Sequence, residues 1–192
     1  MIKSQTLIRV AVALVLSSVI GCSTVTSVNP IGWPLENDLS AELTGTWMGA
    51  EANQLQIHCD STGRLSYAVT EWKDDQGAFV LETGNGVLRT IGDRVFFNYV
   101  ENQEGERPTH SFLLLRVMDG QLVIWLPNVD QFRSLVEEQT LKGDVVDGAE
   151  PTNVVLTGSS EEIAKALETL DLADLFDWAE PAIVLVRVRG QR

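Results

Sequence analysis

The sequence contains few of the residues that most often carry out catalysis. Its 192 residues include two histidines and two cysteines. His58 lies among glutamines on the polar side of an alternating segment, and His110 follows Thr109 at a loop edge. Neither has the spacing of a catalytic or metal-binding motif. The sequence also lacks a glycine-rich phosphate loop, a Gly-x-Ser-x-Gly elbow and a His-Glu-x-x-His motif. We therefore predict that the protein is not an enzyme and uses no cofactor and no metal ion.

Basic residues are also scarce. The chain has 14 lysines and arginines against 27 aspartates and glutamates, a formal net charge of -13. Without residues 1–21, which carry Lys3 and Arg9 and no acidic residue, 12 basic and 27 acidic residues remain, and the charge becomes -15. Binding to nucleic acid requires clustered lysines and arginines that neutralise phosphates, so we exclude nucleic acid as a partner. We attribute the acidity to solubility, and the alternative is attraction of basic partners or divalent cations.

The acidic residues are most concentrated at Asp171, Asp174, Asp177 and Glu180. A calcium site needs six to eight converging oxygens, whereas this spacing spreads the carboxylates along a short helix. One interpretation is a helix capped by Asp171, with Asp174 near its positive end. The other is a site for a metal ion or a basic partner. We favour the helix cap.

Residues 1–22 have the pattern of an export signal. Lys3 and Arg9 precede an apolar run over residues 10–16, and the small or aliphatic residues 19–21 precede Cys22. The apolar run is shorter than the roughly 20 residues that a membrane-spanning helix needs. Through its order Val-Ile-Gly-Cys, the segment resembles the signal of bacterial lipoproteins. The alternative is an ordinary secretory signal in which Cys22 is incidental.

The lipoprotein resemblance implies a modification and a location. In that family the cysteine receives a diacylglyceryl group, a signal peptidase cleaves before it, and the new amine is acylated, which implies lipidation of Cys22. An aspartate after the cysteine tends to retain such proteins on the inner membrane, and this chain has Ser23 there. We therefore expect attachment to the outer membrane through lipid on Cys22, on the periplasmic face.

The second cysteine has no partner for an intramolecular disulfide if Cys22 is lipidated. Cys59 alternates with Leu55 and Ile57 on the apolar side of its segment. We expect a buried thiol that behaves as a small hydrophobic group. The alternative is a reactive or intermolecular thiol.

We divide the chain into three parts. Residues 1–21 are the signal peptide, residues 22–43 are a lipidated tether, and residues 44–192 are a single mainly β domain. Residues 23–37 contain two prolines and a glycine with little periodicity, which suits a short tether. About 170 residues remain after cleavage, enough for one compact domain.

Short alternating segments separated by turn residues dominate residues 44–127. Leu65, Tyr67 and Val69, for example, alternate with polar or small residues, as in an antiparallel sheet with one dry face. We expect a β-meander with strands near residues 46–50, 54–59, 64–72, 78–83, 87–91, 95–100, 111–117 and 121–126, with a Gly84-Asn85-Gly86 turn between two of them. The predicted fold class is mainly β (α+β), an antiparallel meander sheet or a small barrel. Two segments are apolar on both faces and should lie centrally or beneath a helix: residues 112–117 and 122–126.

Two helices and three further strands are expected after residue 127. Asn128 with Gln131 predicts a helix start followed by an apolar side of Phe132, Leu135 and Val136. Ser159 with Glu162 forms a stronger capping-box signal, followed by an apolar stripe of Ile163, Ala166, Leu167 and Leu170 and a Glu161–Lys165 pair. Strands are expected at residues 141–146, 154–157 and 182–189.

The motif Gly45-Thr46-Trp47 follows a predicted helical turn at residues 38–43 and precedes the meander. This order resembles the opening of lipocalins and of lipocalin-like lipoproteins. The resemblance implies an eight-stranded barrel in which the tryptophan closes one end and packs near a basic residue from a late strand, here Arg187 or Arg189. The segments after residue 127 depart from the family, because they exceed its usual tail. The alternative is that the tryptophan is an ordinary core residue.

A lipid anchor without a catalytic constellation predicts a non-catalytic binding or assembly module of the cell envelope, with an envelope protein as its partner. The first alternative is a lipocalin-like carrier of an apolar small molecule, whose identity the sequence does not give. An apolar cavity of about 300 Å³ or more would favour the carrier. The second alternative is an enzyme with carboxylates in a cleft, which would show clustered Asp or Glu with raised pKa values.

Overall fold

Eight antiparallel strands close into a barrel in the computed structural model, which describes residues 24–49, 53–74, 76–101, 108–146 and 153–188. The strands are β3 (Gly45–Met48), β4 (Gln54–Cys59), β5 (Arg64–Lys73), β6 (Ala78–Ile91), β7 (Arg94–Glu101), β8 (Thr109–Met118), β9 (Gln121–Trp125) and β12 (Ile183–Arg187). Strands β3 to β9 pair in chain order, and β12 lies between β9 and β3. The predicted mainly β fold is confirmed, and the meander closes as a small barrel.

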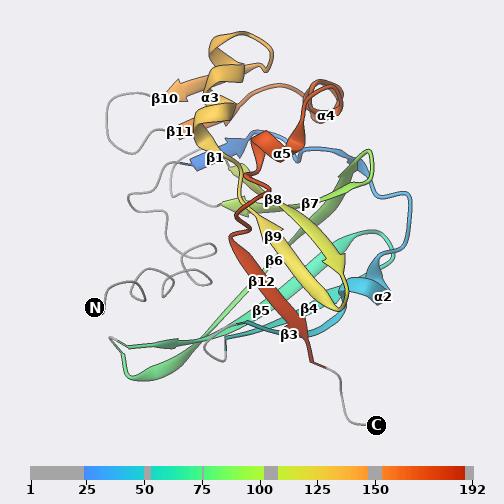
Figure 1. The fold of residues 1–192 in the computed structure, drawn as a ribbon, viewed down its shortest axis with the longest axis vertical. Coiled ribbons are helices and arrows are strands. Elements are labelled where there is room, and N and C mark those ends of the chain that lie inside the picture. Colours follow the sequence, from blue (N-terminus) through green and yellow to red (C-terminus); the bar gives the residue numbers. More distant parts are fainter. Residues whose placement is uncertain (1–23, 50–52, 75, 102–107, 147–152, 189–192) are drawn as a thin grey trace.

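A smaller sheet leaves the barrel at β8. The C-terminal half of β8 pairs with β9, whereas Ser111 and His110 near its start pair with β1 (Thr24–Ser27). Strand β1 also runs parallel to β11 (Asn153–Leu156), which pairs with β10 (Gly143–Val146). The helices α3 (Val129–Glu137), α4 (Ser160–Glu168) and α5 (Leu172–Leu175) lie with this smaller sheet at the top of Figure 1.

Two hydrophobic cores share the barrel wall. Leu113 and Leu115 of β8 point into the barrel, whereas Phe112 and Leu114 of the same strand point outward beneath the helices. The outer core also contains Phe132 of α3 and aromatic and aliphatic residues of α4, α5, β1 and β11. Because β8 and β9 are covered on both faces, their apolar residues do not alternate with polar ones. The prediction for residues 112–117 and 122–126 is confirmed for 112–115 and 122–125, which are buried, whereas Arg116 and Leu126 are exposed.

The predicted helix starts are present. The Ser159 hydroxyl accepts a hydrogen bond from the Glu162 backbone N–H at 3.2 Å, and the Glu162 carboxylate accepts one from the Ser159 N–H at 2.9 Å. The Asn128 side chain accepts from the N–H groups at the start of α3. The Asp171 carboxylate accepts from the Ala173 N–H at 2.9 Å and so caps α5. Asp171 therefore has the structural role that the sequence favoured.

Glu162 is expected to titrate far below its usual range. Hydrogen bonding from Lys142, followed by the bonds with Ser159, lowers the pKa of Glu162 to about 2. The contribution of its ionised form to stability is complete above the unfolded-state pKa and is lost as the pH falls through the folded-state pKa. An NMR titration of the side-chain carboxyl carbon should show the low pKa, and Lys142→Met should raise it toward the ordinary value. An ordinary pKa in the wild type would contradict this expectation.

The expected tether and the expected turn at residues 84–86 both differ from the structure. Residues from Thr24 onward are not a tether, because β1 is paired on both sides and Val25 is 3% exposed. Trp33 and Pro34 form β2, which pairs with β6. The expected turn at residues 84–86 is also wrong, because β6 runs without interruption through both glycines.

Candidate functional site

A tryptophan and an arginine lie in contact where the helical turn before β3 meets the C-terminal strand. Trp47 is fully buried, and its indole N–H donates a hydrogen bond to the Leu43 carbonyl at 2.9 Å. The guanidinium carbon of Arg187 lies 5.3 Å from the centre of the Trp47 ring. Its Nη2 donates to the Ala41 carbonyl at 3.1 Å and to the Thr44 carbonyl. Arg187 thereby ties the C-terminal strand to the helical turn α2 (Ser40–Leu43) and covers the ring.

This contact is the one that the lipocalin resemblance implied for Arg187. The other candidate, Arg189, lies outside the described residues. Strand pairing explains why Arg187 makes this contact, since Arg187 lies directly opposite Trp47 where β12 pairs with β3. Trp47 is a buried core residue that also contacts Arg187, as the resemblance implied.

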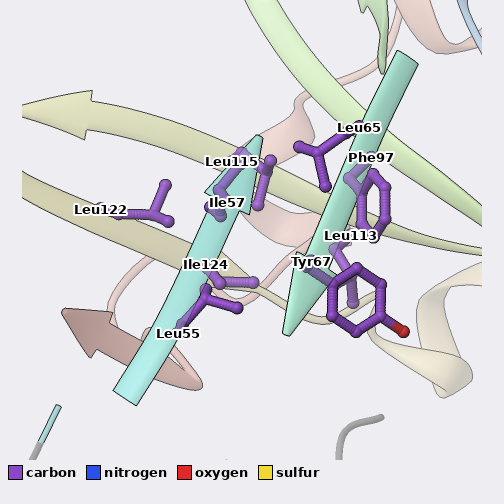
Figure 2. Close-up of a pocket in the computed structure, with 9 residues that line it drawn as sticks. All are labelled: Leu55, Ile57, Leu65, Tyr67, Phe97, Leu113, Leu115, Leu122 and Ile124. Carbon is purple, nitrogen blue, oxygen red and sulfur yellow. The ribbon is translucent and has the colours of Figure 1, made fainter. Parts of the chain in front are cut away.

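The barrel interior is almost filled by side chains. It holds a wholly apolar cavity of about 40 Å³, far below the roughly 300 Å³ at which ligand sites for drug-sized molecules begin. Figure 2 shows its lining residues converging from five strands: Leu55, Ile57, Leu65, Tyr67, Phe97, Leu113, Leu115, Leu122 and Ile124. The Tyr67 and Phe97 rings meet edge to face at 5.8 Å. The interior is therefore a packed core rather than a formed ligand site.

Two glycines make room for these rings. A Cβ atom at Gly84 would lie 2.3 Å from the Tyr67 hydroxyl oxygen. One at Gly86 would lie 2.2 Å from the Asn98 carbonyl oxygen and 2.5 Å from the Phe97 ring. The glycines therefore permit close approach inside a strand, a role that glycine often has there.

A second hollow lies beside α2, and it shares Leu115 with the lining of the interior cavity. Its volume is about 230 Å³, and apolar side chains line it together with Glu42, Asp93 and Arg116. The two carboxylates come from different elements, Glu42 from α2 and Asp93 from the turn between β6 and β7.

The remaining candidate residues are dispersed. His58 is exposed on β4, and burial, with a smaller effect of Arg89, lowers the pKa of the half-buried His110. Cys59 is 3% exposed, and burial raises the pKa of its thiol, as expected of an unreactive cysteine. In the part of the chain that the structure describes, no three His, Cys, Asp or Glu residues lie close enough to hold a metal ion.

The segment after β1 is fixed to the barrel by a residue that the sequence reasoning missed. Asn98 is fully buried on the outer side of β7; its Oδ1 accepts from the Ile31 N–H at 2.7 Å, and its Nδ2 donates to the Ile31 carbonyl at 3.2 Å. Trp33 Nε1 donates to Glu168 at 2.7 Å and joins the segment to α4. The sequence feature that could have indicated this role is a single amide residue, Asn98, within the otherwise apolar run Val95–Val100.

Replacing Asn98 by leucine should lower the free energy of unfolding by about 2–4 kcal/mol, because it leaves the buried N–H and C=O of Ile31 unpaired. Urea denaturation followed by circular dichroism measures the loss. The matched control is Asn85→Leu on the exposed face of β6, which should change stability by less than about 0.5 kcal/mol. Equal effects of the two substitutions would show that the Asn98–Ile31 bonds contribute nothing.

The lipidation candidate Cys22 lies outside the described residues, two positions before the start of β1. Within the described segments, none of the helices combines the length and the apolarity needed to span a bilayer. Comparisons with known protein families, with curated proteins and with solved structures give no match for this chain.

Proposed function

We propose that the protein is a non-catalytic module of the cell envelope, anchored through lipid on Cys22 to the outer membrane, facing the periplasm and acting through its outer surface. The observation that carries the proposal is the filled barrel. With an apolar space of only about 40 Å³ inside the barrel, the surface left for recognition is the exterior.

The position of β1 supports a close attachment to the membrane. Only Ser23 separates Cys22 from Thr24, where β1 begins. Two residues of extended chain span roughly 7 Å. Lipid on Cys22 would therefore hold the folded domain against the bilayer, which suits a module that assembles with other membrane components.

The proposal is tested on envelope fractions. Mass spectrometry of the mature N-terminus should find an acylated Cys22, and affinity purification should recover a specific envelope protein that is lost with Cys22→Ala. A free, unacylated N-terminus at another residue would contradict the anchor. Recovery of no specific envelope component would contradict the assembly role.

The second candidate is a lipocalin-like carrier of an apolar small molecule. The closed eight-stranded barrel, the Trp47–Arg187 contact and the apolar interior favour it. A carrier would have to move Tyr67 and Phe97 to enlarge the cavity. Titration of the mature protein with a fluorescent fatty-acid analogue distinguishes the two: saturable binding of one molecule per chain favours the carrier, and the envelope module predicts none.

A further inference from the structure

The β5–β6 hairpin projects beyond the barrel. Strand β4 pairs with β5 as far as Thr70, and β7 pairs with β6 from Gly86 onward. Beyond these points, β5 and β6 pair with each other as far as Lys73 and Ala78. Figure 1 shows the resulting arm extending at the lower left, outside the remainder of the barrel.

The arm has charged residues on its inner side and apolar residues on its outer side. Leu65 and Val69 of β5 point into the barrel, and the same alternation places Glu71 and Lys73 on the inner side. Glu71 and Lys73 form an ion pair at 3.1 Å, with side chains only 18% and 27% exposed. The outer side carries Trp72, Phe79 and Leu81, which are 45%, 61% and 65% exposed.

The exchange of apolar and charged residues between the two sides of the arm does not result from a shift in strand register. The pairing of β5 with β6 is continuous over ten residue pairs, so no bulge exchanges the two faces. Soluble strands place apolar residues toward the core and polar residues toward water. The arm instead carries its apolar residues on the outer side. This arrangement indicates that the outer side is covered when the protein functions.

The outer side is already organised for contact. The Trp72 and Phe79 rings meet edge to face at 5.1 Å, and the Trp72 indole N–H donates to the Asp74 carboxylate at 2.8 Å. The indole thus has a polar end toward the turn and an apolar ring on the face. Tryptophans of this kind are enriched at the boundary between lipid headgroups and acyl chains.

Charge and size favour a bilayer over a protein as the occupant. Although the chain has 27 acidic residues, the outward positions of β3, β4, β5, β6 and β12 carry none. Each large side chain of the arm offers an area of the order of 150–250 Å² at most. The half-exposed trio therefore falls short of the roughly 800 Å² per partner that a stable protein interface buries.

We infer that the outer side of the arm is a second membrane contact: Trp72, Phe79 and Leu81 insert into the headgroup–acyl boundary of the bilayer that holds Cys22. This inference rests on the proposed attachment at Cys22. In Figure 1, β1 lies with the smaller sheet in the upper part of the molecule, and the arm projects at the lower left. Two contacts fix the orientation of the barrel, which a single flexible attachment does not.

The test anchors the protein chemically, so that its outcome does not depend on acylation in the cell. The mature chain is coupled through the Cys22 thiol to a maleimide lipid in phosphatidylcholine vesicles; the buried Cys59 does not react. Bromine atoms on the acyl chains quench tryptophans that reach the membrane. The quenched emission should correspond to about one of the five tryptophans. Trp72→Phe should abolish the quenching.

A double substitution of Phe79 and Leu81 by serine should reduce quenching at least threefold, whereas Val186→Ser, which alters a 54% exposed valine on β12, should leave it unchanged. Adding anionic phosphatidylglycerol should weaken the contact, because the mature chain, with 12 basic and 27 acidic residues, carries a net charge of -15. Absence of quenching, or quenching that persists in Trp72→Phe, would overturn the inference. Cross-linked dimers through the arm without quenching would also overturn it and assign the face to a second copy.

Discussion

Replacing Trp47 by alanine is expected to lower the free energy of unfolding by about 3–5 kcal/mol, the range for removing a large buried aromatic side chain. Trp47 is fully buried, and its loss also breaks the hydrogen bond to Leu43 and leaves the Arg187 guanidinium without the ring that it covers. Urea denaturation monitored by far-ultraviolet circular dichroism measures the change, because it does not depend on tryptophan emission.

The matched control is Trp72→Ala, which removes the same side chain from an exposed position. We expect it to change the free energy of unfolding by less than about 1 kcal/mol. Arg187→Met and the double variant complete a double-mutant cycle, whose coupling energy reports the Trp47–Arg187 contact directly. A coupling near zero would mean that Trp47 stabilises the fold as a core residue alone.

Gly86→Ala is expected to destabilise the barrel by about 3 kcal/mol, because the added methyl group would lie 2.2 Å from the Asn98 carbonyl oxygen. A backbone oxygen within a paired strand has little room to move. Gly84→Ala is the matched comparison: its methyl group would meet the Tyr67 hydroxyl end, which can move by side-chain rotation. We therefore expect Gly84→Ala to cost roughly half as much in thermal or urea unfolding. The reverse order would contradict the steric argument.

Local patterns were sufficient to predict most of the barrel. The alternation around Leu65 and Val69 predicted strands with one dry face, and the caps at Asn128 and Ser159 predicted two helix starts. These features depend on residues close together in the chain. For that reason, they can be read without knowledge of the final topology.

The N-terminal segment could not be predicted in this way. Strand β1 has four residues, and its partners are β8 and β11, with Thr24 opposite Asn153. A short strand is stabilised by neighbours that lie far away in the sequence, so its prolines and glycine indicated a tether instead. The hydrogen bonds of Asn98 with Ile31 are of the same long-range kind.

The roles of the β6 glycines and of the outer side of the arm could not be predicted from the sequence for a different reason. A Gly-Asn-Gly sequence is a strong turn signal, but it also suits a strand against which aromatic rings pack. The choice depends on where Tyr67 and Phe97 lie in three dimensions. Likewise, the alternation at Trp72 and Phe79 is visible in the sequence, but the face that each residue occupies is fixed only once the strand is registered in the barrel.

The order of the strands has a consequence for how the protein is made. The barrel closes through β12, whose partner β3 lies near the beginning of the folded chain. Until residues 183–187 pair with them, β3 and β9 each have an open edge that can pair with another chain. The pairing of β12 with β3 joins segments far apart in the sequence, so its loop-closure entropy cost is larger than that of the hairpins between neighbouring strands. Until β12 pairs with both strands, the backbone groups along the open edges of β3 and β9 are available to another chain, so the C-terminal strand protects the barrel from edge-to-edge association.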